Sequence, residues 1–198
     1  MKKGIAFFDF DGTITTKDTL LEFIKFSKGP LSFYTGFLLY SPYLIAYKIK
    51  LISNQLAKVK ILRHFFGKMP LEEFTQTCNA FADKALPALI RPEALQQIRD
   101  HQSAGIIVVI VSASPENWLS CWTSKMELAL IGTRLEVKNN YLTGNIIGKN
   151  CHGEEKVSRI RNAYELNEYA EIYAYGDSSG DKPMLALATK SFFKPFRN

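Results

Sequence analysis

Hydrophobic residues along the chain follow two alternating patterns. Short, unbroken apolar runs are typical of strands buried on both faces, and they cover residues 4–8, 106–111 and 171–175. One further strand is expected within 127–137, paired through a turn at Asn139-Asn140 with a strand over 141–147, and a final strand is expected over 191–196. Apolar residues at helical spacing predict helices over 92–104, 115–125, 154–164 and 182–188. Strands that alternate with helices predict an α/β fold with a doubly wound parallel sheet.

A long helical segment interrupts this alternation between Thr16 and about Ile90. The pattern predicts helices that begin at Asp18 or Thr19 and end near Gly29-Pro30, and then over 31–39, 42–52, 54–66 and 71–86. Roughly 70 residues are too many for a connecting loop. We therefore expect two units, a core made of residues 1–15 and 91–198 and a helical cap made of residues 16–90.

Composition limits the class of protein and its partners. Of 198 residues, 46% are hydrophobic and 22% charged, which is typical of one soluble globular domain or a domain with an insertion. The net charge of +6 suits anionic ligands or a membrane surface, but the basic residues form no dense run of the kind that binds nucleic acid. The three widely spaced cysteines predict neither disulfides nor a zinc site, and so a reducing, cytoplasmic location.

Residues 29–47 form an apolar stretch without any charged residue. Pro30 and Pro42 interrupt the stretch and several hydroxyl groups dilute it, which argues against a spanning helix. Two helices packed inside a small domain explain it as well as shallow contact with a membrane does. We therefore leave peripheral membrane association as an open expectation for this segment.

Polar residues gather where the predicted strands end, and these are Asp9, Asp11, residues 112–114 and residues 176–181; Lys156 begins a later helix. The carboxyl ends of parallel strands share one sheet edge, where ligands bind in open α/β folds. Two neighbouring carboxylates such as Asp9 and Asp11 need a cation, a shared proton or water to offset their repulsion. Taken singly, each group has an ordinary explanation as a helix cap, a solvated lysine or a turn residue. Their recurrence at one edge favours a common site.

These stretches resemble the four motifs of the haloacid dehalogenase (HAD) superfamily in order and over nearly the whole chain. The motifs correspond to Asp9-x-Asp11-Gly12-Thr13, the strand-end Ser112, Lys156 and Gly176-Asp177-x-x-x-Asp181. The large helical insertion before the second motif, with a small hairpin before the third, is similar to the phosphoserine-phosphatase-like branch (subfamily IB). The resemblance implies a Rossmann-like sheet with an inserted cap and a phosphatase activity.

The resemblance also implies a role for each matched residue. Asp9 would be the nucleophile that forms an aspartyl-phosphate, and Asp11 would protonate the leaving group and then activate water. The implied Mg²⁺ ligands are Asp9, the main-chain carbonyl of Asp11, and Asp177. The implied phosphate-binding residues are Ser112, Ala113 and Lys156. Asp181 and Thr13 would support the site from behind.

Substrate recognition is less well determined by the sequence. In the phosphoserine branch an acidic residue nine positions after the nucleophile and a cap arginine bind the substrate, and Asp18 and Arg63 are the candidates here. Asp18 also suits a helix cap, and Arg63 an exposed position. The stretches 29–47 and 151–156 are similar to those of HAD-type phosphatidylglycerophosphate phosphatases. We expect a small organic phosphomonoester as substrate, with a lipid phosphate as the alternative.

Other functions differ from this pattern in identifiable ways. Dehalogenases of this superfamily need no metal and lack the second aspartate of the first motif, so Asp11 and the Asp177–Asp181 pair favour phosphoryl transfer. A phosphomutase shares these groups, so the acceptor, water or a second hydroxyl, stays open. A phosphate-binding module without turnover also stays open. A signalling receiver is disfavoured, because receivers are shorter and lack both the insertion and the Asp-x-Asp loop. The sequence does not predict the oligomeric state.

Overall fold

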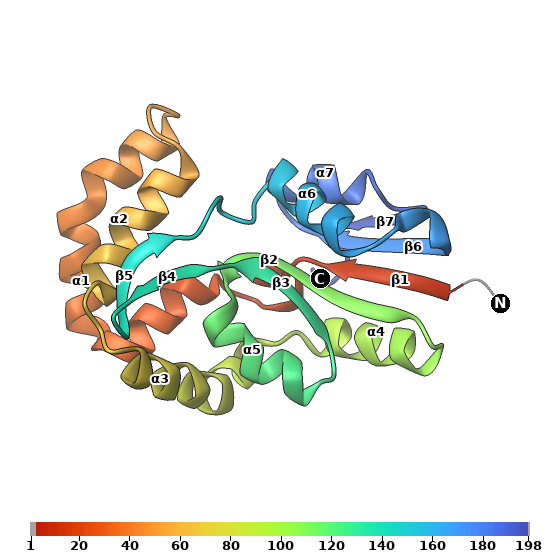
Figure 1. The fold of residues 1–198 in the computed structure, drawn as a ribbon, viewed down its shortest axis with the longest axis horizontal. Coiled ribbons are helices and arrows are strands. Elements are labelled where there is room, and N and C mark those ends of the chain that lie inside the picture. The colour runs from red at the N-terminus through yellow and green to blue at the C-terminus, as the bar shows by residue number, and fades with distance from the viewer. Residues whose placement is uncertain (1–2, 198) are drawn as a thin grey trace.

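The computed structural model describes residues 3–197, which form a parallel sheet covered by helices on both faces (Figure 1). β1 (Lys3–Phe8) lies in the centre, between β2 (Ile107–Pro115) and β6 (Tyr169–Gly176). β3 (Ala129–Thr133) and β7 (Lys190–Phe193) form the two edges, and all four neighbouring pairs are parallel. The predicted doubly wound α/β fold is confirmed.

The central strand is buried on both faces, as its unbroken apolar run predicts. Ile5 and Phe7 pack in the cluster that contains Ile160 and Met184, from α6 (Glu154–Ala163) and α7 (Lys182–Leu185). On the opposite face, Phe8 belongs to the cluster formed with α4 (Pro92–Ser103) and α5 (Glu116–Lys125). Successive side chains of a strand point to opposite faces, so one short run holds both helical layers to the sheet.

Three helices gather at one end of the molecule, and they are α1 (Thr19–Lys48), α2 (Asn54–Phe66) and α3 (Leu71–Lys84) (Figure 1). The predicted break at Gly29 is confirmed, because this residue has φ 77° and ψ 164° inside α1. The predicted separation of 31–39 from 42–52 is wrong. Pro42 lacks the N–H that would bond the Leu38 carbonyl, but the Ser41 hydroxyl donates to that oxygen at 2.8 Å, and the helix continues.

The insertion leaves and re-enters the core at adjacent points. The amide of Thr16 donates to the carbonyl of Leu89 at 2.8 Å, and the amide of Arg91 donates to the carbonyl of Ile14 at 2.8 Å. These bonds join the two connecting segments side by side, so the cap is attached to the sheet through a short paired neck.

The predicted hairpin is confirmed as β4 (Leu135–Lys138) and β5 (Tyr141–Ile146), with Asn139 and Asn140 both at positive φ in the turn. The single strand expected within 127–137 is wrong, because this segment is divided between β3 of the parallel sheet and β4 of the hairpin. It lies against the helical cap, since the amide of Lys68 donates to the carbonyl of Leu142 at 2.7 Å and Leu142 donates back to Met69 at 2.9 Å. The hairpin, from the second half of the chain, thus packs against the cap and extends it.

The end of β2 differs from its prediction. The strand continues to Pro115 instead of ending at Ser112, because its pairing with β3 resumes at Pro115 and Thr133 after a register shift beyond Val111. Residues 112–114 therefore form a bulge, which is a common way to redirect side chains beside a site. The final strand is also shorter than predicted and covers 190–193 rather than 191–196.

Within residues 3–197, no helix has the combination of length and hydropathy that crossing a bilayer requires.

Candidate active site

Asp9 follows the carboxyl end of β1, the central strand, in the middle of the edge at which the parallel strands end. Its amide continues the ladder to β6 by donating to the Tyr175 carbonyl at 2.9 Å, and this fixes the backbone. The residue is 6% exposed, and its carboxylate accepts from Thr13 Oγ1 at 3.1 Å and from Lys156 Nζ at 2.5 Å. Burial raises the pKa of Asp9 to about 7, because loss of hydration outweighs the attraction of Lys156.

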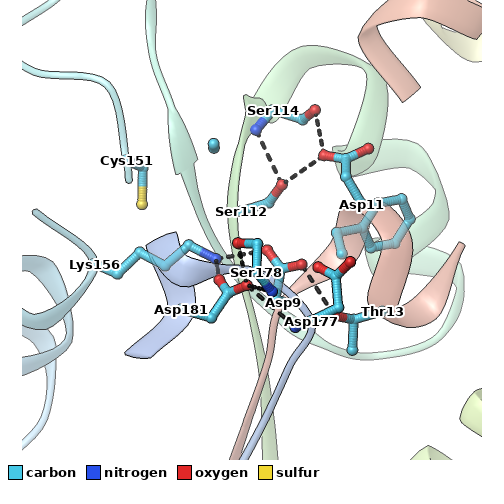
Figure 2. Close-up of polar contacts among 12 residues, drawn as sticks. Asp9, Asp11, Thr13, Ser112, Ser114, Cys151, Lys156, Asp177, Ser178 and Asp181 are labelled. Atoms are coloured by element: carbon cyan, nitrogen blue, oxygen red, sulfur yellow. Dashed lines mark hydrogen bonds and ion pairs between the residues drawn. The ribbon is translucent and has the colours of Figure 1, made fainter. Parts of the chain in front are cut away.

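Lys156 joins three parts of the core through one buried ammonium group. It lies in the first turn of α6, is 1% exposed, and bonds Asp181 Oδ1 at 2.7 Å as well as Asp9 (Figure 2). Burial opposes the charged amine, but the two carboxylates reverse this and hold the pKa of Lys156 above its usual range. Burial likewise opposes ionisation of Asp181, yet Lys156 and Ser178 hold the pKa of that carboxyl below its usual range.

Three carboxylates converge beside this ammonium group. One oxygen each from Asp9, Asp177 and Asp181 lies within 4.8 Å of the others. Burial raises the pKa of Asp177, although the Arg197 guanidinium forms an ion pair with it and opposes that shift. Clustered carboxylate oxygens are the donors that hard divalent cations prefer.

Gly12 allows the loop that follows Asp9 to pack against the Asp177 side chain. It has φ +82°, and a Cβ at this position would lie 2.5 Å from Asp177 Oδ2. Any side chain here would be strained in its backbone and would also displace the Asp177 carboxylate. The Asp-Gly turn is therefore required by the packing of the site.

The Asp11 carboxylate is directed toward β2 and α1, away from the three clustered carboxylates (Figure 2). Its Oδ1 accepts from both the amide and the hydroxyl of Thr19 at 2.6 Å. Its Oδ2 accepts from Ser114 Oγ at 2.7 Å and from Ser112 Oγ at 3.3 Å. Thr19 opens α1, where the amide lacks a helical partner, and the bulge of β2 presents the two serines.

A cavity of about 560 Å³ lies above these groups, between the core and the cap. Its polar lining comes mainly from the sheet edge and includes Asp9, Asp11, Ser114, Lys156, Asp177 and Asp181. Its apolar lining comes from the cap and includes Leu20, Leu21, Phe37, Leu44, Tyr47 and Ile61. The cavity therefore joins a charged floor to a largely hydrophobic wall.

The two predicted substrate-binding residues lie in different places. Asp18 lines the cavity and also caps α1, since its Oδ1 accepts from the Leu21 amide at 3.2 Å. Arg63 is not among the cavity-lining residues; its Nε donates to Asn145 Oδ1 on β5 at 2.8 Å. The structure therefore brings Asp18 to the site and leaves Arg63 outside it.

Lys58 of α2 is a cap cation that reaches the cavity and that was not predicted from the sequence. Its Nζ donates to the Ala113 carbonyl at 2.7 Å and to Asn150 Oδ1 at 3.2 Å. Desolvation lowers the pKa of Lys58, against the attraction of Asp11 and Asp18. A signal existed in the helical spacing, because Asn54, Ala57, Lys58 and Ile61 share one helix face and all line the cavity.

Three residues that contact the predicted site were given no role in it from the sequence. Thr19 and Ser114 bond Asp11, and Arg197 pairs with Asp177 close to the Gly12 carbonyl. Thr19 could have been recognised from the sequence, because it follows the Asp9–Thr13 motif at the start of a predicted helix, where a backbone amide has no helical partner. The position of Arg197 has no local signal, because it depends on how the segment after β7 returns to the sheet edge.

Comparison with known proteins gives a consistent family match. A model of the haloacid dehalogenase-like hydrolases matches residues 6–186. Protein CicA of Caulobacter vibrioides is 35% identical over 192 residues, which cover 96% of this chain and 85% of CicA. A probable phosphatase of Mycobacterium tuberculosis is 30% identical over 203 residues, covering 97% of this chain and 69% of that protein.

The fold has a similar match among solved structures. A phospho-aspartyl intermediate analogue of phosphoserine phosphatase superposes with a TM-score of 0.69 and 17% identity, over 96% of this chain and 86% of that one. The match covers both the parallel sheet and the inserted helices, so the whole architecture is shared.

Proposed function

Because this chain belongs to the haloacid dehalogenase-like hydrolase family, we propose that it is a phosphatase that hydrolyses phosphomonoesters through an aspartyl-phosphate on Asp9, with Mg²⁺ as cofactor. The observation that carries the proposal is the cluster of Asp9, Asp177 and Asp181 around the buried Lys156. The probable phosphatase among its relatives and the fold shared with phosphoserine phosphatase support the same activity.

The donor set fits a hard divalent cation. Asp181 accepts four hydrogen bonds, one from Lys156 and three from the Ser178 hydroxyl and the amides of Asp177 and Ser178, whereas Asp9 accepts two. Asp9 and Asp177, with the main-chain carbonyl of Asp11, would therefore hold the ion, and Asp181 would fix the position of Lys156 and the Asp177 loop. When bound, Mg²⁺ supplies positive charge that screens the phosphoryl group from the Asp9 carboxylate.

In the first step the Asp9 carboxylate attacks phosphorus, a P–O bond forms, and the ester P–O bond breaks. The departing alkoxide takes a proton from Asp11. Oδ2 of Asp11 suits this role, because its partners Ser112 and Ser114 are hydroxyls that can donate or accept. Oδ1 is fixed as an acceptor by the Thr19 amide.

In the second step water attacks phosphorus and gives its proton back to Asp11. The bond to Asp9 breaks, and inorganic phosphate leaves with the Asp9 carboxylate restored. Lys156 would stabilise negative charge on Asp9 and on the phosphoryl oxygens throughout. Release of inorganic phosphate, instead of a second phosphate ester, distinguishes this hydrolysis from a phosphomutase reaction.

A lipid phosphate is a second candidate substrate beside a small organic phosphomonoester. The cap contributes Phe37, Leu44 and Tyr47 to the cavity wall, and none of them is needed to bind a polar metabolite. An acyl chain fits a wall of this kind, while Asp18 and Lys58 suit the amino and acidic groups of a small metabolite. Competing the two ester classes in one assay would separate the candidates.

Metal removal tests the proposed activity directly. We expect Mg²⁺-dependent release of p-nitrophenol from p-nitrophenyl phosphate, and we expect EDTA to reduce the rate by about 100-fold or more, because the carboxylate cluster no longer has its counter-charge. Added Mg²⁺ should restore the rate. Phosphate binding without any turnover in Mg²⁺ would instead support a non-catalytic module and contradict the proposal.

Lys58 and Arg63 provide a matched pair of cap substitutions. We expect Lys58→Met to raise KM for an anionic phosphomonoester by about tenfold, because a charge-assisted hydrogen bond at the cavity is lost. Arg63→Met should leave KM nearly unchanged, because this side chain bonds Asn145 outside the cavity. Steady-state kinetics on both variants checks this, and the opposite ranking would restore Arg63 as the substrate-binding cation.

A further inference from the structure

The second half of α1 carries an exposed stripe of large apolar side chains. Leu31, Leu38 and Leu39 are 78%, 75% and 66% exposed. We define the cap apolar face by the exposed side chains that recur at helical spacing along one side of α1 and at the residue that caps its C-terminus, and these are Leu31, Tyr34, Leu38, Leu39, Ile45 and Ile49. Contiguous exposed apolar patches on otherwise globular proteins mark interaction sites.

The opposite side of the same helix already has its partner. Phe33 is buried, and Phe37, Tyr40 and Leu44 pack against the core cluster that includes Phe65 of α2. α1 is thus apolar around most of its circumference, although protein covers only one side. A helix of this type normally has its second side covered as well.

Charge identifies what can cover the cap apolar face. Residues 23–71 contain no aspartate or glutamate but eight lysines and arginines, so all 19 acidic residues of the chain lie outside this segment. Lys48 and Lys50 are exposed at the end of the apolar stripe. A two-fold copy of the same segment would bring like charges together, whereas an anionic lipid surface would attract them.

We propose that the cap apolar face docks on the surface of an anionic lipid bilayer, with α1 lying in the plane of the interface. The apolar side chains enter the boundary between head groups and acyl chains, and the lysines remain at the phosphate level. Tyr34, one of the residues of the cap apolar face, suits the same level, because tyrosine combines an apolar ring with a polar hydroxyl.

Docking in this orientation brings the cavity close to the lipid. Phe37, Leu44 and Tyr47 of α1 line the cavity on the inner side of the helix whose outer side meets the membrane. One helix diameter, about 10 Å, then separates the cavity wall from the interface. The docking does not depend on the proposed phosphatase activity, and the two can be tested separately.

Vesicle flotation tests the inference. The full chain should float with vesicles that contain about one third phosphatidylglycerol in phosphatidylcholine, and far less with phosphatidylcholine alone. Leu38→Gln/Ile45→Gln should reduce partitioning by about tenfold or more. Lys48→Gln/Lys50→Gln should reduce it by about fivefold for each charge removed, with a weaker effect at high salt.

The matched control is Val137→Gln/Ile147→Gln, which changes two exposed apolar residues on and beside the hairpin and should leave partitioning unchanged. Circular dichroism and turnover of p-nitrophenyl phosphate confirm that Leu38→Gln/Ile45→Gln stays folded. Absence of wild-type flotation with anionic vesicles would overturn the inference. So would a wild-type dimer, detected by light scattering, that the Leu38→Gln/Ile45→Gln pair dissociates, since a second copy would then cover the face.

Discussion

Asp9→Asn is expected to lower phosphate release by on the order of 10⁴-fold or more, because the amide cannot form the acyl-phosphate bond. Asn is nearly isosteric with Asp, and its Oδ1 can still accept from Lys156 while Thr13 can accept from its Nδ2. The loss therefore reports on the nucleophile and not on the geometry around it. Steady-state release of inorganic phosphate in Mg²⁺ provides the measurement.

The same variant should be no less stable than the metal-free wild type at pH 8. Folding raises the pKa of Asp9 from its ordinary value near 3.8 to about 7. The free energy of unfolding of the wild type, compared with that of Asp9→Asn, is therefore highest below about pH 4 and falls as pH rises through about 7. Asparagine does not ionise, so the thermal unfolding midpoint of Asp9→Asn should match or exceed that of the wild type above pH 7.

Asp83→Asn on α3 provides the matched control, because it makes the same chemical change at an exposed ion pair with Lys125. We expect its turnover to equal that of the wild type. Wild-type turnover in a folded Asp9→Asn protein would show that another group attacks phosphorus, and the proposed chemistry would then be wrong.

Lys156→Met is expected to destabilise the protein by about 3–5 kcal/mol at neutral pH and to abolish turnover. Methionine fills much of the same volume but leaves the buried Asp9 and Asp181 without the ammonium group that each now contacts. Two carboxylates would then face each other in a poorly hydrated site. Urea unfolding at pH 7.5, with the free energy extrapolated to water, measures the loss.

The loss should depend on pH in a defined direction. Lys156 holds the pKa of Asp181 below its ordinary value, so this stabilisation is present above about pH 4 and is lost as pH falls through the folded-state pKa. The difference between Lys156→Met and the wild type should therefore shrink in acid. Lys190→Met removes an exposed lysine paired with Glu171 and should change stability far less. A Lys156→Met protein as stable as the wild type at pH 7.5 would contradict the buried pairing.

Most of the core was predictable because its signals are local. A strand buried on both faces must be apolar at every position, and β1 and β2 both meet that condition at Ile5–Phe8 and Ile107–Val111. Asn139 and Asn140 tolerate positive φ, which fixed the hairpin turn in advance. The continuous helix through Pro42 was missed, since the compensating Ser41–Leu38 bond is a side-chain contact that no propensity describes.

For the candidate site, the sequence by itself determined which polar groups follow the carboxyl ends of the strands, because parallel strands have one common direction. Only the tertiary structure decided which side chains from elsewhere join them. Lys58 enters the cavity and Arg63 does not because α2 packs on the hairpin with one particular face. Arg197 meets Asp177, and the bulge of β2 presents Ser112 and Ser114 to Asp11, through contacts between segments far apart in the chain. Such contacts depend on the packing of whole elements, and the local sequence carries no record of that packing.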